Sequence, residues 1–132
     1  MSKQTIYSSR VVPATSPHSH AVKTGGLVFV SGCPPLIPGN AFAQGDFATQ
    51  MRHCMTNIIH VLDDAGSSLE QVVKVNVYLD RISDFPEMNE IYREYFGSDP
   101  ASWPARTTVE ARLPSKEFLL EIDCVAELLP ER

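Results

Sequence analysis

The chain has 132 residues, of which 43% are hydrophobic and 20% are charged, and its formal net charge is −5. This length suits one domain, residues 1–132, with a core large enough to fold without disulfides or a structural metal. The negative charge excludes general nucleic-acid binding, because phosphate backbones attract basic surfaces. No apolar run is long enough to span a membrane, and "MSKQTIYSSR" lacks the apolar core of a signal peptide. We therefore expect a cytoplasmic protein without nucleic-acid or membrane partners.

The first elements in chain order are a strand and a helix. "GGLVFVSG", Gly25–Gly32, predicts a buried strand, because β-branched and aromatic residues lie between glycines. "CPPLIPGN", residues 33–40, holds three prolines and a glycine and predicts a loop. A helix is expected over Asp46–Ala65, with Asp46 as its N-cap and Gly66 after its end. Its apolar stripe comprises Phe47, Met51, Cys54, Met55, Ile58, Val61, Leu62 and Ala65.

A second strand and a second helix follow. "QVVKVNVYLD", residues 71–80, alternates as a strand does, and places the apolar side chains Val73, Val75, Val77 and Leu79 on one face. Asp84 followed by Glu87 at the third position, with Pro86 in the first turn, predicts the start of a helix with a capping box. This helix is expected to end before Gly97.

The chain is expected to finish with strands at about residues 106–113 and 118–129. Two helices can cover only one face of a sheet built from these strands, so the fold class is α+β, with two layers. The other face of the sheet carries polar and apolar side chains together. Such a face is either solvated or packed against another subunit, and composition does not choose between these alternatives.

The three cysteines, Cys33, Cys54 and Cys124, are far apart in the chain and form no CxxC pair. An odd number of separated cysteines favours reduced, buried thiols. A nucleophilic Cys33 is the alternative, because this residue follows "VSG" where a loop is expected.

Four segments resemble one known family in order and at matching spacing. They are "VFVSG" at residues 28–32, "VVKVNVYLDRISDFPEMNEIY" at 72–92, "PARTTVEARLP" at 104–114 and "LEIDCVA" at 120–126. These segments are similar to the RidA family, also called YjgF/YER057c/UK114, and the similarity covers residues 12–126. The resemblance implies a chorismate-mutase-like subunit of the bacillus type, with a mixed sheet and two helices on one face. It also implies a homotrimer with clefts between its subunits.

The activity implied by the resemblance is hydrolysis of reactive enamines and imines to 2-oxo acids and ammonia, without a metal or an organic cofactor. Its substrate is a small carboxylate-bearing molecule. Some members are specialised, as 2-aminomuconate deaminase is. A non-enzymatic protein that binds a metabolite in the same cleft is the alternative, and a holdase-type chaperone is a third function.

The resemblance also assigns site residues. The arginine of the family's P-A-R motif corresponds to Arg106, the glutamate of the last strand to Glu121, the serine of the S-G pair to Ser31, and the asparagine of the second helix to Asn89. Three positions in two segments depart from the family. "SPHSHAV", residues 16–22, places His18 and His20 where the family has tyrosine and glutamine, and Thr108 stands where close relatives often carry cysteine. These departures suggest a member specialised away from the generic imine deaminase.

Each assignment has a chemical reason and a plainer alternative. Arg106 can hold a substrate carboxylate in a bidentate fork. The alternative is a solvated surface arginine without a ligand. Glu121 can position and deprotonate water as a general base, or it can be an ordinary carboxylate on a solvated face. His18 is expected to line the cleft as a proton donor, because the unperturbed pKa of histidine is about 6.5.

The remaining assignments concern substrate binding and metal. Ser31, Asn89 and Thr108 are expected to contact the substrate beside Arg106. His18 and His20 at i, i+2 spacing resemble a pair of metal ligands, but no third ligand stands at a recognisable spacing. We therefore expect no metal, and a solvated loop histidine is the alternative for His20.

Overall fold

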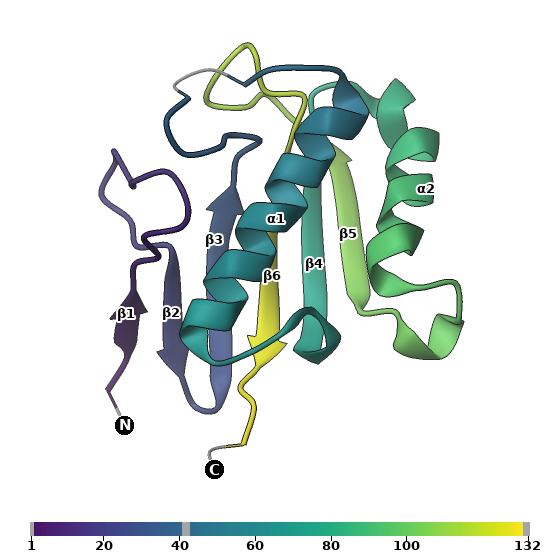
Figure 1. Cartoon of the computed structure of the whole chain (residues 1–132). Coiled ribbons are helices and arrows are strands. Elements are labelled where there is room, and N and C mark those ends of the chain that lie inside the picture. The colour runs from purple at the N-terminus through teal and green to yellow at the C-terminus, as the bar shows by residue number, and fades with distance from the viewer. Residues whose placement is uncertain (1, 41–42, 131–132) are drawn as a thin grey trace.

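The structure is a computed structural model that describes residues 2–40 and 43–130. A six-stranded mixed sheet forms one layer and two helices form the other, as Figure 1 shows. The strands are β1 (Gln4–Ile6), β2 (Ala21–Thr24), β3 (Leu27–Cys33), β4 (Val72–Leu79), β5 (Ala105–Glu110) and β6 (Leu120–Glu127), and the helices are α1 (Phe47–Ala65) and α2 (Phe85–Phe96). This arrangement confirms the two-layer α+β fold expected from the sequence.

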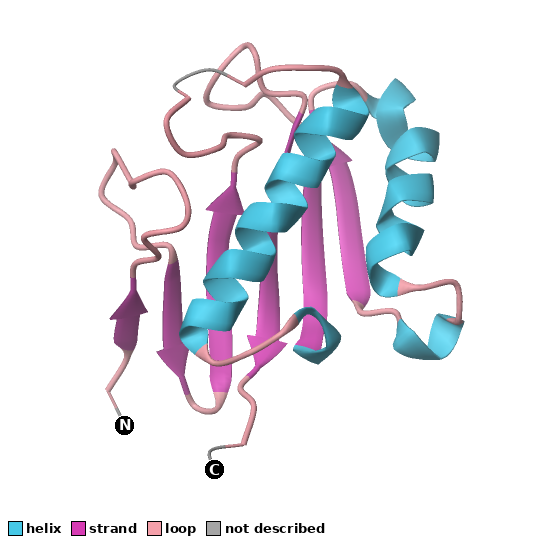
Figure 2. Cartoon of the chain, in the orientation of Figure 1, coloured by secondary structure: helices cyan, strands magenta, loops and turns pink. Residues whose placement is uncertain are grey.

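The order of strands across the sheet is β1-β2-β3-β6-β4-β5. The last strand, β6, is therefore inserted between β3 and β4 and pairs antiparallel with both. β5 pairs only with β4, in parallel, because α2 crosses over the sheet between them. Both helices lie on the same side of the sheet, with α1 in front of its centre and α2 beside β5 (Figure 2).

Helix α1 forms where the sequence predicts it. The Asp46 side chain accepts a hydrogen bond of 2.9 Å from the Thr49 backbone N–H, which satisfies one of the free donors of the first turn. Gly66 ends the helix with a φ of 87°, a left-handed conformation that a glycine adopts without strain. The whole predicted apolar stripe is buried against β3 and β6.

Helix α2 begins at Phe85, as expected, but its capping box is absent. No side chain caps its first turn, because the Asp84 carboxylate accepts hydrogen bonds from the Arg81 guanidinium at 3.0 and 3.1 Å instead. Pro86 in the first turn still favours a helix start, since proline lacks the N–H that would have no partner there.

The predicted alternation of β4 is wrong at its first residue. Val73 is 42% exposed while Val72 is buried, because the pairing with β6 shifts between Val72 and Lys74. An extra residue of this kind is a β-bulge, which turns the following side chains over to the other face. From Val75 onward the alternation follows the prediction.

Two strands were not assigned from the sequence, and two others are shorter than expected. β1 and β2 have only three and four residues, too few for a period of two to be recognised. The strand expected at 106–113 ends at Glu110, and the one expected at 118–129 covers Leu120–Glu127. None of the helices in the described residues is long and apolar enough to cross a membrane.

The two faces of the sheet differ sharply. The face toward the helices is apolar and contributes Val28, Val75, Val77, Leu120 and Ile122 to the core. On the open face, the Asp123 carboxylate accepts hydrogen bonds of 2.8 Å from both the Asn76 amide and the Tyr78 hydroxyl. Phe29, Val73 and Val109 are each more than 40% exposed. The open face therefore has both polar and apolar character.

Candidate functional site

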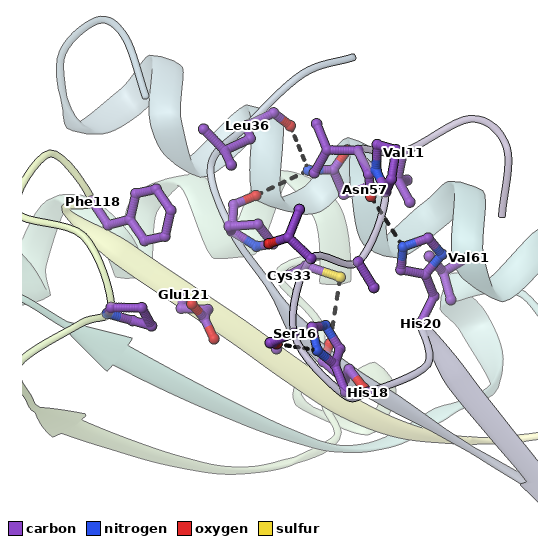
Figure 3. A pocket seen from close by; sticks show the side chains of 18 residues that line it. Val11, Ser16, His18, His20, Cys33, Leu36, Asn57, Val61, Phe118 and Glu121 are labelled. Carbon is purple, nitrogen blue, oxygen red and sulfur yellow. Dashed lines mark hydrogen bonds between the residues drawn. The ribbon is translucent and has the colours of Figure 1, made fainter. Parts of the chain in front are cut away.

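A cavity lies between the loop of residues 11–20, helix α1 and the ends of β3 and β6. Its volume is about 540 Å³, within the range of small-molecule sites. Figure 3 shows two of the expected site residues at this cavity, His18 from the loop and Glu121 from β6, together with Cys33 of β3. A third expected residue, Ser31 of β3, also lines it. Segments far apart in the sequence therefore bring His18, Ser31 and Glu121 to one cavity.

Gly32 makes the position of Glu121 possible. A Cβ atom built on Gly32 would approach the Glu121 Oε1 atom more closely than real Cβ atoms approach other atoms. The pairing of β3 with β6 shifts between Val30 and Cys33, and this irregularity brings the Gly32 backbone against the carboxylate. The backbone conformation does not require a glycine here, because the φ of Gly32 is not positive. The glycine of the S-G pair is therefore needed for the space that it leaves to the Glu121 carboxylate.

The surroundings of Glu121 favour its protonated form. Burial raises the pKa of this carboxyl above its ordinary value, and the nearby negative charge of Asp123 raises it further. His18 acts in the opposite direction and lowers the pKa. Glu121 is thus a stronger base than an exposed glutamate, with a histidine close enough to influence it.

The two histidines of the N-terminal loop have different environments. His20 uses both ring nitrogens within the chain: Nδ1 accepts a hydrogen bond of 2.9 Å from the Ser8 N–H, so Nε2 donates to the Val12 carbonyl at 3.0 Å. His20 therefore fixes the loop and has no nitrogen left for a metal. His18 is exposed, and its Nδ1 lies 2.7 Å from the Ser16 hydroxyl. In the described residues no group of three or more His, Cys, Asp or Glu side chains is arranged to hold a metal ion.

The Ser31 hydroxyl bonds within the chain, and the Cys33 thiol is buried. The Ser31 hydroxyl donates a hydrogen bond of 2.6 Å to the Ser19 carbonyl, so the oxygen can only accept from a ligand. Cys33, like Cys54 and Cys124, is buried, as expected. Burial raises the pKa of the Cys33 thiol, and the nearby Cys124 and Glu121 raise it further. A protonated, buried thiol is a poor nucleophile, which argues against the alternative role of Cys33.

Arg106 and Asn89 lie in a second depression of about 350 Å³, between β5 and α2. The Arg106 guanidinium lies over the ring of Tyr92, 4.7 Å from its centroid, and 5.7 Å from the centroid of Phe85. Its Nη1 atom is 3.9 Å from the Met88 sulfur. Arg106 forms none of the ion pairs found in the described part of the chain. Aromatic faces thus hold the cation without neutralising its charge.

Two more polar groups near this depression have no partner. The hydroxyls of Tyr92 and Thr108 are buried and form no hydrogen bond within the described residues. Burial raises the pKa of Tyr92 to about 12, although the charge of Arg106 acts against this shift. Thr108 lies two residues after Arg106 on β5 and therefore faces the same side of the sheet. Trp103 lines the depression too, with its indole N–H bonded to the Gly97 carbonyl at 2.7 Å.

The expected site residues therefore fall into two groups. His18, Ser31 and Glu121 line the cavity, whereas Asn89 and Arg106 line the depression under α2. Glu121 alternates with the buried residues Leu120 and Ile122, so it faces away from the helices, while Arg106 contacts helix α2. A single chain does not bring the acid and the cation together.

Sequence reasoning missed two polar residues that shape the cavity. Asn57 donates from its amide nitrogen to the carbonyls of Pro34 and Leu36, at 2.9 and 2.8 Å. Gln50 donates to the Glu117 carbonyl at 3.0 Å and accepts from the Leu119 N–H at 2.8 Å. Both side chains are buried on the apolar stripe of α1, and a polar residue on such a stripe is the signal that could have found them.

The mixed sheet with both helices on one face places this chain among the α+β domains of the L-PSP/YjgF fold. The family model described as Endoribonuclease L-PSP matches residues 9–128. The chain belongs to this family, which is the RidA, or YjgF, family indicated by the sequence motifs.

Relatives match over nearly their whole length. A RutC family protein of Pyrococcus abyssi is 41% identical over 128 residues, which cover 96% of this chain and 98% of the relative. The 3-aminoacrylate deaminase RutC of Acinetobacter baylyi is 36% identical over 97% of this chain and 100% of its own. The crystal structure of Escherichia coli TdcF with bound serine has a TM-score of 0.86 and 31% identity, and covers 94% of this chain and 98% of that chain.

Replacing Glu121 with Gln is expected to raise the free energy of unfolding at neutral pH. The folded-state pKa of Glu121 lies above its unfolded value, so the stabilising contribution of the protonated form is lost as the pH rises through the folded-state pKa. Glutamine does not ionise, so the Glu121→Gln variant does not lose stability as the pH rises through the folded-state pKa of Glu121. Urea unfolding of both proteins between about pH 4 and 8 measures the effect, since glutamate titrates near 4.3 when unperturbed. Glu127→Gln, at the exposed end of the same strand, is the control, and equal stability of Glu121→Gln and wild type at every pH would contradict the expectation.

Tyr92→Phe is expected to leave stability unchanged or to raise it by about 1 kcal/mol, because it keeps the ring under Arg106 and removes an unpartnered buried hydroxyl. Tyr92→Leu removes the aromatic face and is expected to cost roughly 1 to 3 kcal/mol. Urea unfolding compares the three proteins. A clear loss of stability in Tyr92→Phe would mean that the hydroxyl has a partner in solution.

Proposed function

We propose that this protein is a deaminase that hydrolyses small carboxylate-bearing enamines and imines to 2-oxo acids and ammonia. The observation that carries the proposal is the state of Arg106: its guanidinium is held on aromatic rings, lines a depression and forms no ion pair in the described part of the chain. Such a cation matches a carboxylate ligand. The relative named 3-aminoacrylate deaminase supports the same class of reaction.

In the proposed reaction, Arg106 binds the substrate carboxylate through two parallel N–H···O bonds. Glu121 takes a proton from a water molecule, whose oxygen attacks the carbon of the protonated C=N bond. The resulting tetrahedral adduct carries both a hydroxyl and an amino group. As the carbon–nitrogen bond breaks, the nitrogen gains a proton and leaves as ammonia. The hydroxyl of the adduct loses its proton, and its carbon and oxygen become the carbonyl of the 2-oxo acid.

The raised pKa of Glu121 suits this role. A general base is most effective when its pKa approaches the working pH, while it still remains ionised. Burial and Asp123 move the carboxyl in that direction. His18, at the same cavity, is the proposed donor of the proton to the departing nitrogen. Ser31, with a free acceptor position, and Asn89 and Thr108, beside Arg106, are the proposed substrate contacts.

The proposed site lies between subunits of a homotrimer. The separation of Glu121 from Arg106 onto opposite faces of the sheet supports this assembly, because a neighbouring copy can bring its own Arg106 to the cavity. The open sheet face also supports it, since Phe29, Val73 and Val109 expose apolar surface there. We also propose a cytoplasmic location, as expected from the sequence.

A metabolite-binding protein without turnover is the second candidate. The structure of TdcF with bound serine supports it, because serine carries a carboxylate but is not an imine. Calorimetry with 2-oxobutyrate, beside assays of imine turnover, separates the two functions. Saturable binding in the absence of turnover would favour the second. 2-Aminomuconate, the specialised substrate suggested by the resemblance, belongs in the same assay.

Arg106→Ala is expected to lower kcat/KM for a carboxylated imine by roughly 10- to 100-fold, because a charge-assisted hydrogen bond contributes about 1.5–3 kcal/mol. The association state, measured by sedimentation, is expected to remain trimeric. Arg106→Lys keeps the charge without the planar fork and is expected to fall between the two. Arg52→Ala, an exposed arginine already paired with Glu94, is the control. Wild-type activity in Arg106→Ala would exclude the carboxylate clamp.

Gly32→Ala is expected to reduce turnover about as much as Glu121→Gln does, within the 10² to 10⁴ range typical of a general base. The new methyl group would occupy the space of the Glu121 carboxylate and displace it. The fold is expected to tolerate the change, because the backbone of Gly32 is not left-handed and the end of a glutamate side chain can move. Turnover and urea unfolding are measured together, and a fully active Gly32→Ala would show that the carboxylate is not needed in this position.

A further inference from the structure

The segment between β1 and β2 carries part of the proposed site and has no regular structure of its own. Residues 7–20, which we call the β1–β2 loop, form neither a helix nor a strand, as Figure 1 shows. His18, the proposed proton donor, lies near the end of this loop. Among the described residues its ring bonds only to the Ser16 hydroxyl, 2.7 Å away in the same loop. The position of His18 therefore depends on what attaches the loop to the rest of the chain.

The last turn of helix α1 carries charges that are unfavourable at that end of a helix. The carbonyl groups at a helix C-terminus carry partial negative charge and favour cations. Here Asp63 and Asp64 add two carboxylates, and the helix has no basic residue of its own in this turn. A cation from another part of the chain would offset both carboxylates.

Arg10 of the β1–β2 loop supplies this cation. Its Nη2 atom lies 2.6 Å from Asp64 Oδ1 and 2.8 Å from Asp63 Oδ2. The same atom donates to the His60 carbonyl of α1 at 3.2 Å. The Ser8 hydroxyl and the Arg10 guanidinium hold the pKa of the Asp64 carboxyl below its usual value. We call the contacts of Arg10 with Asp63 and Asp64 the arginine clamp.

Hydrogen bonds lead from the arginine clamp along the loop. The Arg10 backbone N–H donates to the Ser8 hydroxyl at 3.2 Å, and the Ser8 N–H donates to His20 Nδ1 at 2.9 Å. His20 Nε2 donates in turn to the Val12 carbonyl at 3.0 Å. His18 lies between Val12 and His20 in the sequence, so these bonds join the two sides of the stretch that carries it. The clamp attaches that stretch to α1.

The arginine clamp is expected to contribute little to the stability of the whole fold. The Arg10 side chain is 41% exposed and that of Asp63 is 71% exposed, and exposed ion pairs are weakened by solvent. The buried stripe of α1 does not involve these side chains. A contact of this kind can still order a loop, because loops open independently of the core. Loss of the clamp should therefore loosen the loop and leave the core folded.

We propose that Arg10 is a positioning residue. By holding the β1–β2 loop to the last turn of α1, it keeps His18 at the cavity where the departing nitrogen is protonated. This inference rests on the proposed deaminase function and on the role proposed for His18 in it. Arg10 lines neither the cavity at Glu121 nor the depression at Arg106, so it acts through the loop alone.

Arg10→Ala is expected to lower kcat by about 10-fold and to leave KM nearly unchanged, because a group misplaced by about 1 Å can cost as much as 100-fold in rate. The substrate is the imine that an L-amino-acid oxidase generates from methionine, and release of the 2-oxo acid above the spontaneous rate is measured. Arg10→Lys keeps the charge and is expected to recover most of kcat. Arg52→Ala, which breaks another exposed ion pair of α1, with Glu94, is the matched control with wild-type kcat.

The double variant Asp63→Asn/Asp64→Asn breaks the arginine clamp from the helix side. It also removes two carboxylates from the C-terminus of α1, which favours the helix. The midpoint of urea unfolding is therefore expected to stay the same or to rise, while kcat falls as it does in Arg10→Ala. A contact that served stability alone would lower both quantities together or neither, and that result would overturn the positioning role.

A double-mutant cycle tests whether the clamp acts through His18. Arg10→Ala is expected to lower kcat no further when it is added to His18→Ala, because the group that it positions is already absent. The same loss in both backgrounds would overturn the inference. Sedimentation compares the association state of each variant with that of the wild type, so that a change in assembly is not mistaken for a change in position.

Amide hydrogen exchange examines the loop without an activity assay. Peptides covering residues 7–20 are expected to exchange faster in Arg10→Ala than in wild type or Arg52→Ala, while peptides covering β4 and β6 keep their rates. Unchanged exchange in residues 7–20 would overturn the inference. A wild-type chain that hydrolyses no imine would overturn the proposed function and this role with it, whereas an active wild type with an equally active Arg10→Ala would overturn the positioning role alone.

Discussion

The alternation of side chains along β-strands separates the two charged groups on which the proposed chemistry depends. Glu121 leaves β6 on the face away from the helices, because its neighbours Leu120 and Ile122 are required in the core. Arg106 leaves β5 on the helix side and lies against Tyr92 of α2. This separation keeps the acid and the cation from neutralising each other within a chain, and it leaves each group available to a ligand.

The stability of the fold alone does not require the environments of Glu121 and Arg106. The Glu121 carboxyl is half-buried near another carboxylate, and both conditions destabilise its charged form. Arg106 contacts aromatic rings and a sulfur atom rather than a carboxylate, and the buried hydroxyls of Tyr92 and Thr108 nearby have no partner in the described residues. Unpaired polar groups are uncommon in protein interiors. Their gathering at these positions is consistent with a surface prepared for a ligand or for a second subunit.

The elements with long, regular patterns were predictable, and the short or irregular ones were not. The stripe of α1 and the alternation of β4 after Val75 follow directly from the sequence. The bulge at Val73 was missed, because an extra residue in a strand depends on the partner strand. The capping box at Asp84 was wrong, because Arg81 offers the carboxylate a competing donor. For the site, the sequence motifs predicted His18, Ser31 and Glu121. The roles of Asn57 and Gln50 could not be predicted, because these side chains bond to the backbones of loops far away in the sequence.

The sequence by itself determined the types of most elements, their order along the chain, the two-layer architecture and the family, because helical and strand periodicities and short motifs are local properties. Only the tertiary structure decided that Gly32 makes room for Glu121 and that Tyr92 lies under Arg106. It also decided that the Glu121 and Arg106 side chains line separate cavities. The physical reason is that each of these contacts joins residues from different elements. Their distances are set by how the sheet and helices pack, and no local pattern records that packing.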